Sequence, residues 1–341
     1  LFRFRFAKEH RMFIPQIYPL TLALMILSMI SWGSWANTQK ATGSWRFELF
    51  YWDYVWGIVL LSLIVGLTFG RTEPANPESF FHNLGSASVR NMLLALAGGV
   101  IFNIANMLLV AAIGIAGLAV AFPIGIGLAL VVGTVLNYVV TPAGNPLMLF
   151  GGVALVCTAI VLDAMAYRKL SGNVQVTTKG IVLSLLAGIF MGFFYPFIAK
   201  AIKGEGHLGP YTVMFVFALG ILGSNLVLNY ALMRRPITGA PPVSLRDYFA
   251  ARGGLHAWGV LGGLIWGVGG VSNFVASYAQ MVGPATSYAL GQGATMVSAL
   301  WGVFVWKEFR GAGPAAIRLL TLMFVFFILG LASVALAPVV K

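Results

Sequence analysis

Charged residues are scarce in this chain. Of its 341 residues only 9% are Asp, Glu, Lys or Arg, whereas soluble domains carry about 25%, so the composition excludes an ordinary soluble protein. The single cysteine, Cys157, excludes an intramolecular disulfide. The sequence also lacks an H-E-x-x-H zinc motif, a G-x-S-x-G nucleophile motif, a phosphate-binding loop and a Cys/His cluster with metal-ligand spacing. We therefore expect no enzyme activity, no cofactor and no bound metal.

Long apolar runs take the place of charge. Hydrophobic residues make up 59% of the chain, and the mean hydropathy is +0.90. Runs of around twenty apolar residues can cross a ~30 Å hydrocarbon core, and helices satisfy their own backbone groups in lipid. These features predict an all-α, multi-pass protein of the plasma (inner) membrane. The ten predicted spans are roughly 17–37, 49–70, 92–113, 117–138, 146–167, 180–200, 211–232, 256–280, 284–305 and 315–338.

The formal net charge of +12 comes from Lys and Arg that lie mainly between the apolar runs. In short loops of a membrane protein such residues act as topology signals. They form no basic run beside stacking aromatics, so we expect no nucleic-acid partner. Both sides of the predicted membrane carry similar numbers of basic residues, which leaves the sidedness of the termini open.

Two segments of the chain, 97–127 and 262–293, resemble each other. Each has a glycine pair, an asparagine further along and a later G-x-G. Two matching pairs of glycines are separated by the same number of residues along the chain. The matching residues are Asn106 and Asn273, Gly125 and Gly291, and Gly127 and Gly293. Five helices followed by five more place equivalent helices in opposite orientations, which is a transporter architecture with its site near the membrane midplane.

The repeat predicts the division of the chain. We expect two inverted five-helix repeats behind a short N-terminal segment. The predicted units are the N-terminal segment 1–16, the first repeat 17–167, the central loop 168–179 and the second repeat 180–338.

Polar side chains within the spans indicate where a solute site lies, because a bilayer tolerates them mainly at cavities or between helices. Amides offer donors and acceptors, and indole and phenol rings offer flat stacking surfaces. Such a lining suits a neutral, planar or hydroxyl-rich solute; contacts between helices and an interfacial aromatic belt are the alternative. The candidates on the first, third, sixth, eighth and ninth helices are Trp32, Trp35, Asn37, Asn103, Asn106, Tyr195, Trp266, Asn273, Tyr288 and Gln292.

Asp53 lies near the start of the run 49–70. In a first helical turn, the helix dipole favours a carboxylate without any further role. The functional alternative is a carboxyl group whose apolar, aromatic surroundings let it take up and release a proton. Asp163 is expected to pair with Arg168 or to reach the membrane surface, and Glu308 to be an interfacial charge.

Several segments resemble the ureide permease family of the drug/metabolite transporter superfamily. They include FYWDYVWGIVLLSLIVGLTFG, GTVLNYVV, RRPITG and WGVFVWKEF, and the resemblance extends over nearly the whole chain from about residue 12. It implies ten helices in two inverted repeats and proton-coupled uptake of neutral nitrogen heterocycles such as allantoin and uracil. It also implies functional roles for Tyr51, Asp53 and Tyr54 and for the asparagines of the third and eighth helices, with Tyr51 expected to contact the solute and Asp53 to couple protons. The central loop is shorter than in plant members, and WGSWANTQ is also similar to bacterial glucose/ribose porters.

These observations predict a proton-coupled, alternating-access transporter for small neutral polar solutes, with ureides or nucleobases preferred. The alternatives are a monosaccharide symporter for sugars such as glucose, ribose or rhamnose, a drug or metabolite exporter, and a membrane sensor or enzyme without flux. The expected partners are the solute, protons and the lipid bilayer, with a monomer or a homodimer both open.

Overall fold

The computed structural model describes residues 12–71, 79–171 and 177–340, and the regular secondary structure in these ranges is helical. Ten segments in it are long and apolar enough to cross a membrane, which confirms the predicted multi-pass, all-α class. The spanning helices are α1 (Tyr18–Ser34) continued by α2 (Ala36–Ala41), α3 (Phe47–Thr68), α5 (Val89–Ala116), α6 (Leu118–Val140), α7 (Pro146–Ser171), α8 (Thr178–Ala201), α9 (Pro210–Arg234), α11 (Gly253–Tyr278), α12 (Pro284–Gly291) continued by α13 (Ala294–Leu300) and the π-helix η1 (Trp301–Val305), and α14 (Pro314–Leu336).

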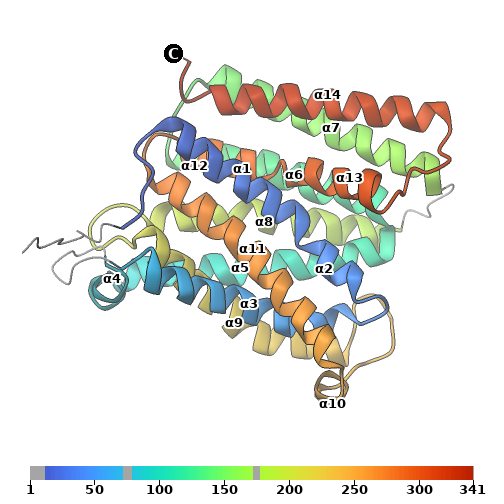
Figure 1. The fold of residues 1–341 in the computed structure, drawn as a ribbon, viewed down its shortest axis with the longest axis horizontal. Coiled ribbons are helices and arrows are strands. Elements are labelled where there is room, and N and C mark those ends of the chain that lie inside the picture. Colours follow the sequence, from blue (N-terminus) through green and yellow to red (C-terminus); the bar gives the residue numbers. More distant parts are fainter. Residues whose placement is uncertain (1–11, 72–78, 172–176, 341) are drawn as a thin grey trace, which may run out of the picture.

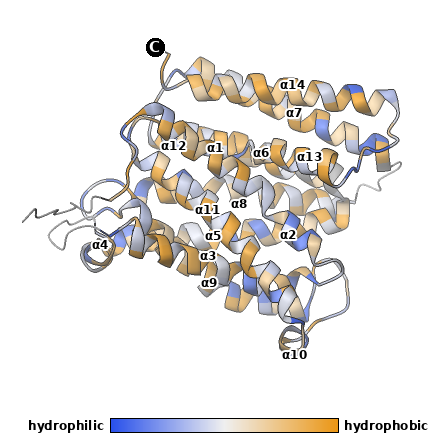
Figure 2. Ribbon diagram, viewed as in Figure 1, coloured by the Kyte–Doolittle hydropathy of each residue, from blue (hydrophilic) through white to orange (hydrophobic). Residues whose placement is uncertain are grey.

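The spans alternate in direction between two ends of the molecule (Figure 1). One end carries the short helix α4 (Phe80–Ser86), and we call it the α4 end. The opposite end carries the short helix α10 (Leu245–Phe249), and we call it the α10 end. Figure 2 shows mostly hydrophobic residues along the spans, with hydrophilic residues gathered toward these ends. Large apolar side chains such as Trp56 and Ile328 are exposed, as expected for a surface that faces lipid.

Glycines allow the spans to approach one another closely. A Cβ atom on Gly263 of α11 would lie 1.9 Å from the carbonyl oxygen of Tyr54 on α3, and one on Gly99 of α5 would lie 2.1 Å from that of Phe217 on α9. Helices in lipid associate through such small residues because packing replaces the hydrophobic effect. Helices α7 and α14 form an outer pair in the same way, through Gly152 and Gly330 (Figure 1).

Two spans are interrupted where the sequence suggested continuous helices. The first span breaks at Trp35, between α1 and α2, and the ninth breaks at 292–293 and then continues as a π-helix. Local irregularities of this kind bring polar side chains and backbone groups to the inside of a membrane protein.

The connections also differ in detail from the prediction. The central loop predicted at 168–179 is shortened by α7 and α8 from both sides, and its residues 172–176 lie outside the described ranges, as do residues 1–11 of the predicted N-terminal segment. The connection from α9 to α11 contains α10, which begins with a capping box formed by Ser244 and Asp247.

Candidate functional site

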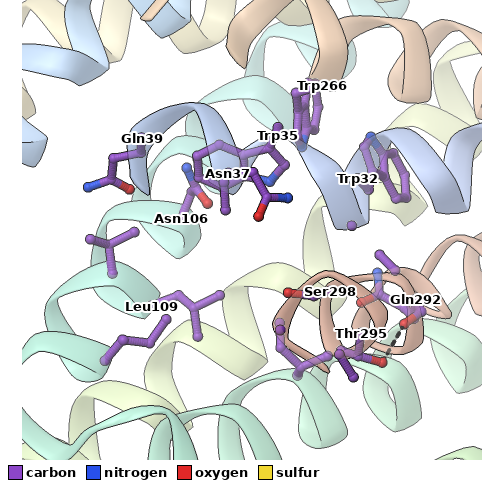
Figure 3. Close-up of a pocket in the computed structure, with 18 of the residues that line it drawn as sticks. Trp32, Trp35, Asn37, Gln39, Asn106, Leu109, Trp266, Gln292, Thr295 and Ser298 are labelled. Atoms are coloured by element: carbon purple, nitrogen blue, oxygen red, sulfur yellow. Dashed lines mark hydrogen bonds between the residues drawn. The ribbon is translucent and has the colours of Figure 1, made fainter. Parts of the chain in front are cut away.

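A cavity of about 510 Å³ extends from the middle of the spans to the α10 end. Residues of α1, α2, α5, α6, α7, α8, α11, the broken ninth span and the segment that follows it line the cavity. Figure 3 shows Asn37, Asn106 and Trp266 on one side of the cavity and Gln292, Thr295 and Ser298 on the other. Its size falls within the range of roughly 300–1,000 Å³ that is usual for small-molecule sites.

The inner part of the cavity is aromatic. Trp32 of α1 and Trp266 of α11 are stacked, with ring centroids 5.8 Å apart and an interplanar angle of 20°. The ring of Trp32 fits between Gly269 and Gly291, since a Cβ atom on either glycine would lie 2.5 Å from it. The tryptophans therefore present flat apolar surfaces that the surrounding helices hold in place.

Amide side chains supply the polar part of the lining. Asn106 donates through Nδ2 to the hydroxyl of Tyr51 over 3.1 Å, and no residue in the described ranges donates to its Oδ1 atom. Asn37 accepts a 2.6 Å hydrogen bond from Nε1 of Trp306. Gln292 reaches the cavity from the break between α12 and α13. Six predicted contact residues line the cavity: Trp32, Trp35, Asn37, Asn106, Trp266 and Gln292.

The other predicted contact residues lie behind this lining. Tyr51 donates to Oδ1 of Asn103 over 2.9 Å and holds Asn106 at the same time, so it positions a cavity amide from the second layer. Tyr195 donates to Oδ1 of Asn273 over 2.5 Å. Tyr288 donates to backbone carbonyl groups of α6 and α8. All five side chains in this second layer, Tyr51, Asn103, Tyr195, Asn273 and Tyr288, are buried.

Asp53 also lies apart from the cavity lining. It sits in the second turn of α3, and not in the first turn as the sequence suggested, because the helix begins at Phe47. Its Oδ1 atom accepts from the hydroxyl of Tyr248 over 2.6 Å, and its Oδ2 atom lies 2.8 Å from Nδ1 of His256. Burial raises the pKa of Tyr248, and the hydrogen bond to Asp53 and its negative charge raise that pKa further. Asp53 thus ties α3 to α10 and to the start of α11.

A charged group at the α10 end of the cavity was missed by the sequence reasoning. Nζ of Lys40 lies 2.5 Å from Oε1 of Glu308, and the Tyr167 hydroxyl donates to Oε2 of Glu308 over 2.6 Å. Burial raises the pKa of Glu308, but the bonds from Lys40 and Tyr167 outweigh burial and hold it below the ordinary 4.5. The ammonium of Lys40 also lies 4.4 Å from the ring centroid of Trp306.

Asp163 lines the cavity beside this group. The expected pairing of Asp163 with Arg168 is wrong. No ion pair within the described ranges joins these two residues, and the Arg168 side chain is exposed. Residues five positions apart do not share a helix face, whereas residues four apart do. The spacing of Asp163 and Tyr167 was the signal that could have found this part of the site.

Comparison with known proteins connects this geometry to a family. The sequence profile of the ureide permease family matches residues 50–177 and 168–337. Ureide permease 1 of Arabidopsis thaliana is 24% identical and aligns with 91% of this chain and 95% of its own length. The glucose uptake protein GlcU of Bacillus subtilis (strain 168) is 23% identical, with 85% of this chain and 89% of that protein aligned.

A solved crystal structure shows the same fold at a TM-score of 0.64 and 13% identity, over 91% of this chain and 96% of that chain. The profile covers far more than half of the sequence, and the ten-span fold agrees with a multi-pass integral membrane protein. The chain therefore belongs to the ureide permease family.

Proposed function

We propose that this protein is an alternating-access carrier that moves small, neutral, planar solutes of the ureide or nucleobase class across the plasma membrane together with protons. The observation that carries the proposal is the combination, in one cavity, of stacked tryptophans with amide side chains from distant helices. The names of the ureide permeases among the relatives support the same solute class.

The chemistry of the lining matches that class. A cyclic ureide or a pyrimidine has N–H donors and C=O acceptors in one plane, and Asn106 and Gln292 offer complementary groups. The faces of Trp32 and Trp266 offer stacking surfaces for the same ring. Lys40 and Glu308 neutralise each other, so neither presents an unpaired charge to an entering solute.

The positions of the lining residues support alternating access. Trp32, Asn37 and Asn106 come from the predicted first repeat, and Trp266 and Gln292 from the second. The cavity reaches the α10 end. At the α4 end, two asparagines donate hydrogen bonds to the loop between α8 and α9. Nδ2 of Asn83 donates to the carbonyl group of His207 over 3.0 Å, and Nδ2 of Asn91 donates to the carbonyl group of Gly206 over 2.9 Å. A change of access would open these contacts and close the cavity at the α10 end.

Asp53 is the proposed coupling residue. Its carboxylate holds Tyr248 and His256, so proton uptake would weaken the attraction that ties α3 to α10 and α11. We expect Asp53→Asn to change the pH profile of solute uptake. An unchanged pH profile in this variant would remove Asp53 from the coupling mechanism.

Sugar transport is the second candidate, favoured by the similarity to the glucose uptake protein. Aromatic rings and amides bind sugars as well as heterocycles, so the lining does not separate the two classes.

A panel of solutes decides between them. The purified protein is heated with allantoin, uracil, xanthine, glucose, ribose or rhamnose, since a ligand that binds the folded state raises the melting temperature by mass action. Stabilisation by a heterocycle, followed by its uptake into proteoliposomes, supports the ureide class. Stabilisation by sugars alone would replace that class with sugars. No binding and no uptake of any of them would contradict the proposed function.

A further inference from the structure

The carboxyl group of Asp163 differs from the other acidic groups of the site. Its side chain lines the cavity, and its Oδ1 atom is inaccessible to solvent and has no hydrogen-bond partner within the described ranges. Both oxygens of Asp53, by contrast, have partners, and so do both oxygens of Glu308. Asp163 is thus the acidic cavity residue with an unsatisfied oxygen.

The groups around Asp163 do not neutralise it. On its own helix, Tyr167 lies one turn further on and donates to Glu308. From the segment after η1, Glu308 acts on Asp163 as a second negative charge. From α2, the ammonium of Lys40 is bound to Glu308. Arg318 of α14, the helix that packs along α7, is exposed.

A carboxylate oxygen that is inaccessible to solvent and has no partner is costly, and a neighbouring negative charge increases that cost. A metal ion could remove the cost, but the described ranges hold no group of three His, Cys, Asp or Glu that could bind one. A proton removes it without further ligands. As a carboxylic acid, Asp163 would also gain an O–H donor for a solute carbonyl, whereas the carboxylate would accept from a solute N–H.

We propose that Asp163 is a proton-binding residue inside the solute cavity, so that the carrier exchanges a proton there as solute enters and leaves. The exchange is a simple association of carboxylate and proton, with the proton passing to water at the α10 end. The inference rests on the proposed function, and it adds to Asp53 a second titrating carboxyl group that the solute itself can contact.

Two measurements on the full-length protein test it. The first is infrared difference spectroscopy between acidic and alkaline pH, without solute, which detects the C=O stretch of a protonated carboxyl group. We expect a band in the wild type that is absent in Asp163→Asn and shifts to lower pH in Glu308→Gln, where the neighbouring negative charge is removed. The control is Glu205→Gln, which removes an exposed carboxyl group at the α4 end and should keep the band.

The second measurement follows protons with a pH dye trapped in phosphatidylcholine–phosphatidylglycerol vesicles while an allantoin gradient, or in parallel a uracil gradient, drives transport. We expect proton movement in the wild type and its loss in Asp163→Asn. Equal infrared bands or equal proton movement in the two proteins would overturn the proposal.

The remaining outcomes are also decisive. If Asp163→Asn does not fold, Asp163→Glu is used: a shifted carboxyl band supports the assignment, and an unshifted band overturns it. If the wild type transports no solute of the panel, the proposed function fails, but the infrared band still establishes or refutes proton binding at Asp163.

Discussion

The hydroxyl of Tyr195 on α8 donates a 2.5 Å hydrogen bond to Oδ1 of Asn273 on α11. Nδ2 of the same asparagine donates to the hydroxyl of Ser28 on α1 and to the carbonyl group of Ser287 on α12. One buried amide therefore joins four spans just outside the solute cavity, and Tyr195 fixes its orientation.

Tyr195→Phe tests this connection. The Ser287 hydroxyl lies 3.1 Å from the carbonyl oxygen of Asn273 and 3.2 Å from its Oδ1 atom, so in the variant it can donate its one hydrogen to Oδ1. We therefore expect a loss of about 1 kcal/mol and not the full cost of an unsatisfied group. A fall in melting temperature of the purified protein measures it. Tyr230→Phe, which changes a tyrosine that is 39% exposed, is the control. Equal melting temperatures for Tyr195→Phe and the wild type would show that the bond contributes nothing.

Gly263→Ala should destabilise the contact between α3 and α11. The added methyl group would lie 1.9 Å from the carbonyl oxygen of Tyr54, and backbone atoms can move away only if the helices separate. Overpacking of this kind costs about 1–3 kcal/mol. Gly223→Ala in α9 is the matched control, since nothing lies within 4 Å of the position that its methyl group would take. Size-exclusion chromatography of both variants compares the yields of folded protein, and equal yields would contradict the prediction.

The cavity amides should determine solute affinity. We expect Asn106→Ala and Gln292→Ala each to weaken binding by about tenfold, since one hydrogen bond to a solute contributes about 1 kcal/mol or somewhat more. The dissociation constant of the solute identified in the panel measures this effect. Gln16→Ala changes an exposed amide before α1 and should bind normally. If both cavity variants bind as the wild type does, the solute lies elsewhere.

The ion pair of Lys40 and Glu308 should give a pH-dependent contribution to stability. The pKa of Glu308 is held below the ordinary 4.5, so the contribution is present above that pH and is lost as pH falls through the lowered value. We expect the wild type to melt above Glu308→Gln at pH 7 and the difference to shrink below about pH 4.5. Because the Lys40 side chain is 46% exposed, solvent screens the pair and the difference should be small. A difference that grows in acid would reverse the assigned sign.

The ten spans could be predicted from the sequence because a hydrocarbon core imposes one requirement on each segment separately, namely some twenty apolar residues. The interruptions at Trp35 and at Gln292 could not, since neither position carries a proline or another residue type that ends a helix. The inverted repeat stays a prediction, and the alternating direction of the spans is compatible with it.

The site was predicted in part, for a physical reason. Polarity inside a span marked Asn103 and Asn106 alike, but only the helix rotation and the neighbouring Tyr51 decide that Asn106 reaches the cavity and Asn103 does not. Asp163 was expected to pair with Arg168 or to reach the membrane surface, whereas the charge that acts on it is that of Glu308, which follows the ninth span. Contacts between distant spans carry no signal in a single sequence.

The arrangement of charge and aromatic rings along the cavity has a consequence for the order in which a solute loses its hydration shell. Lys40 and Glu308 lie near the α10 end, and Trp32 and Trp266 lie at mid-span. In the proposed transport mechanism, a solute that enters from that end would first exchange water for polar protein groups and would lose its last water only against the indole rings. The solute would then lose its water in steps, and protein contacts would replace the lost water contacts at each step. No single point along the path would have to supply the whole free energy of dehydration.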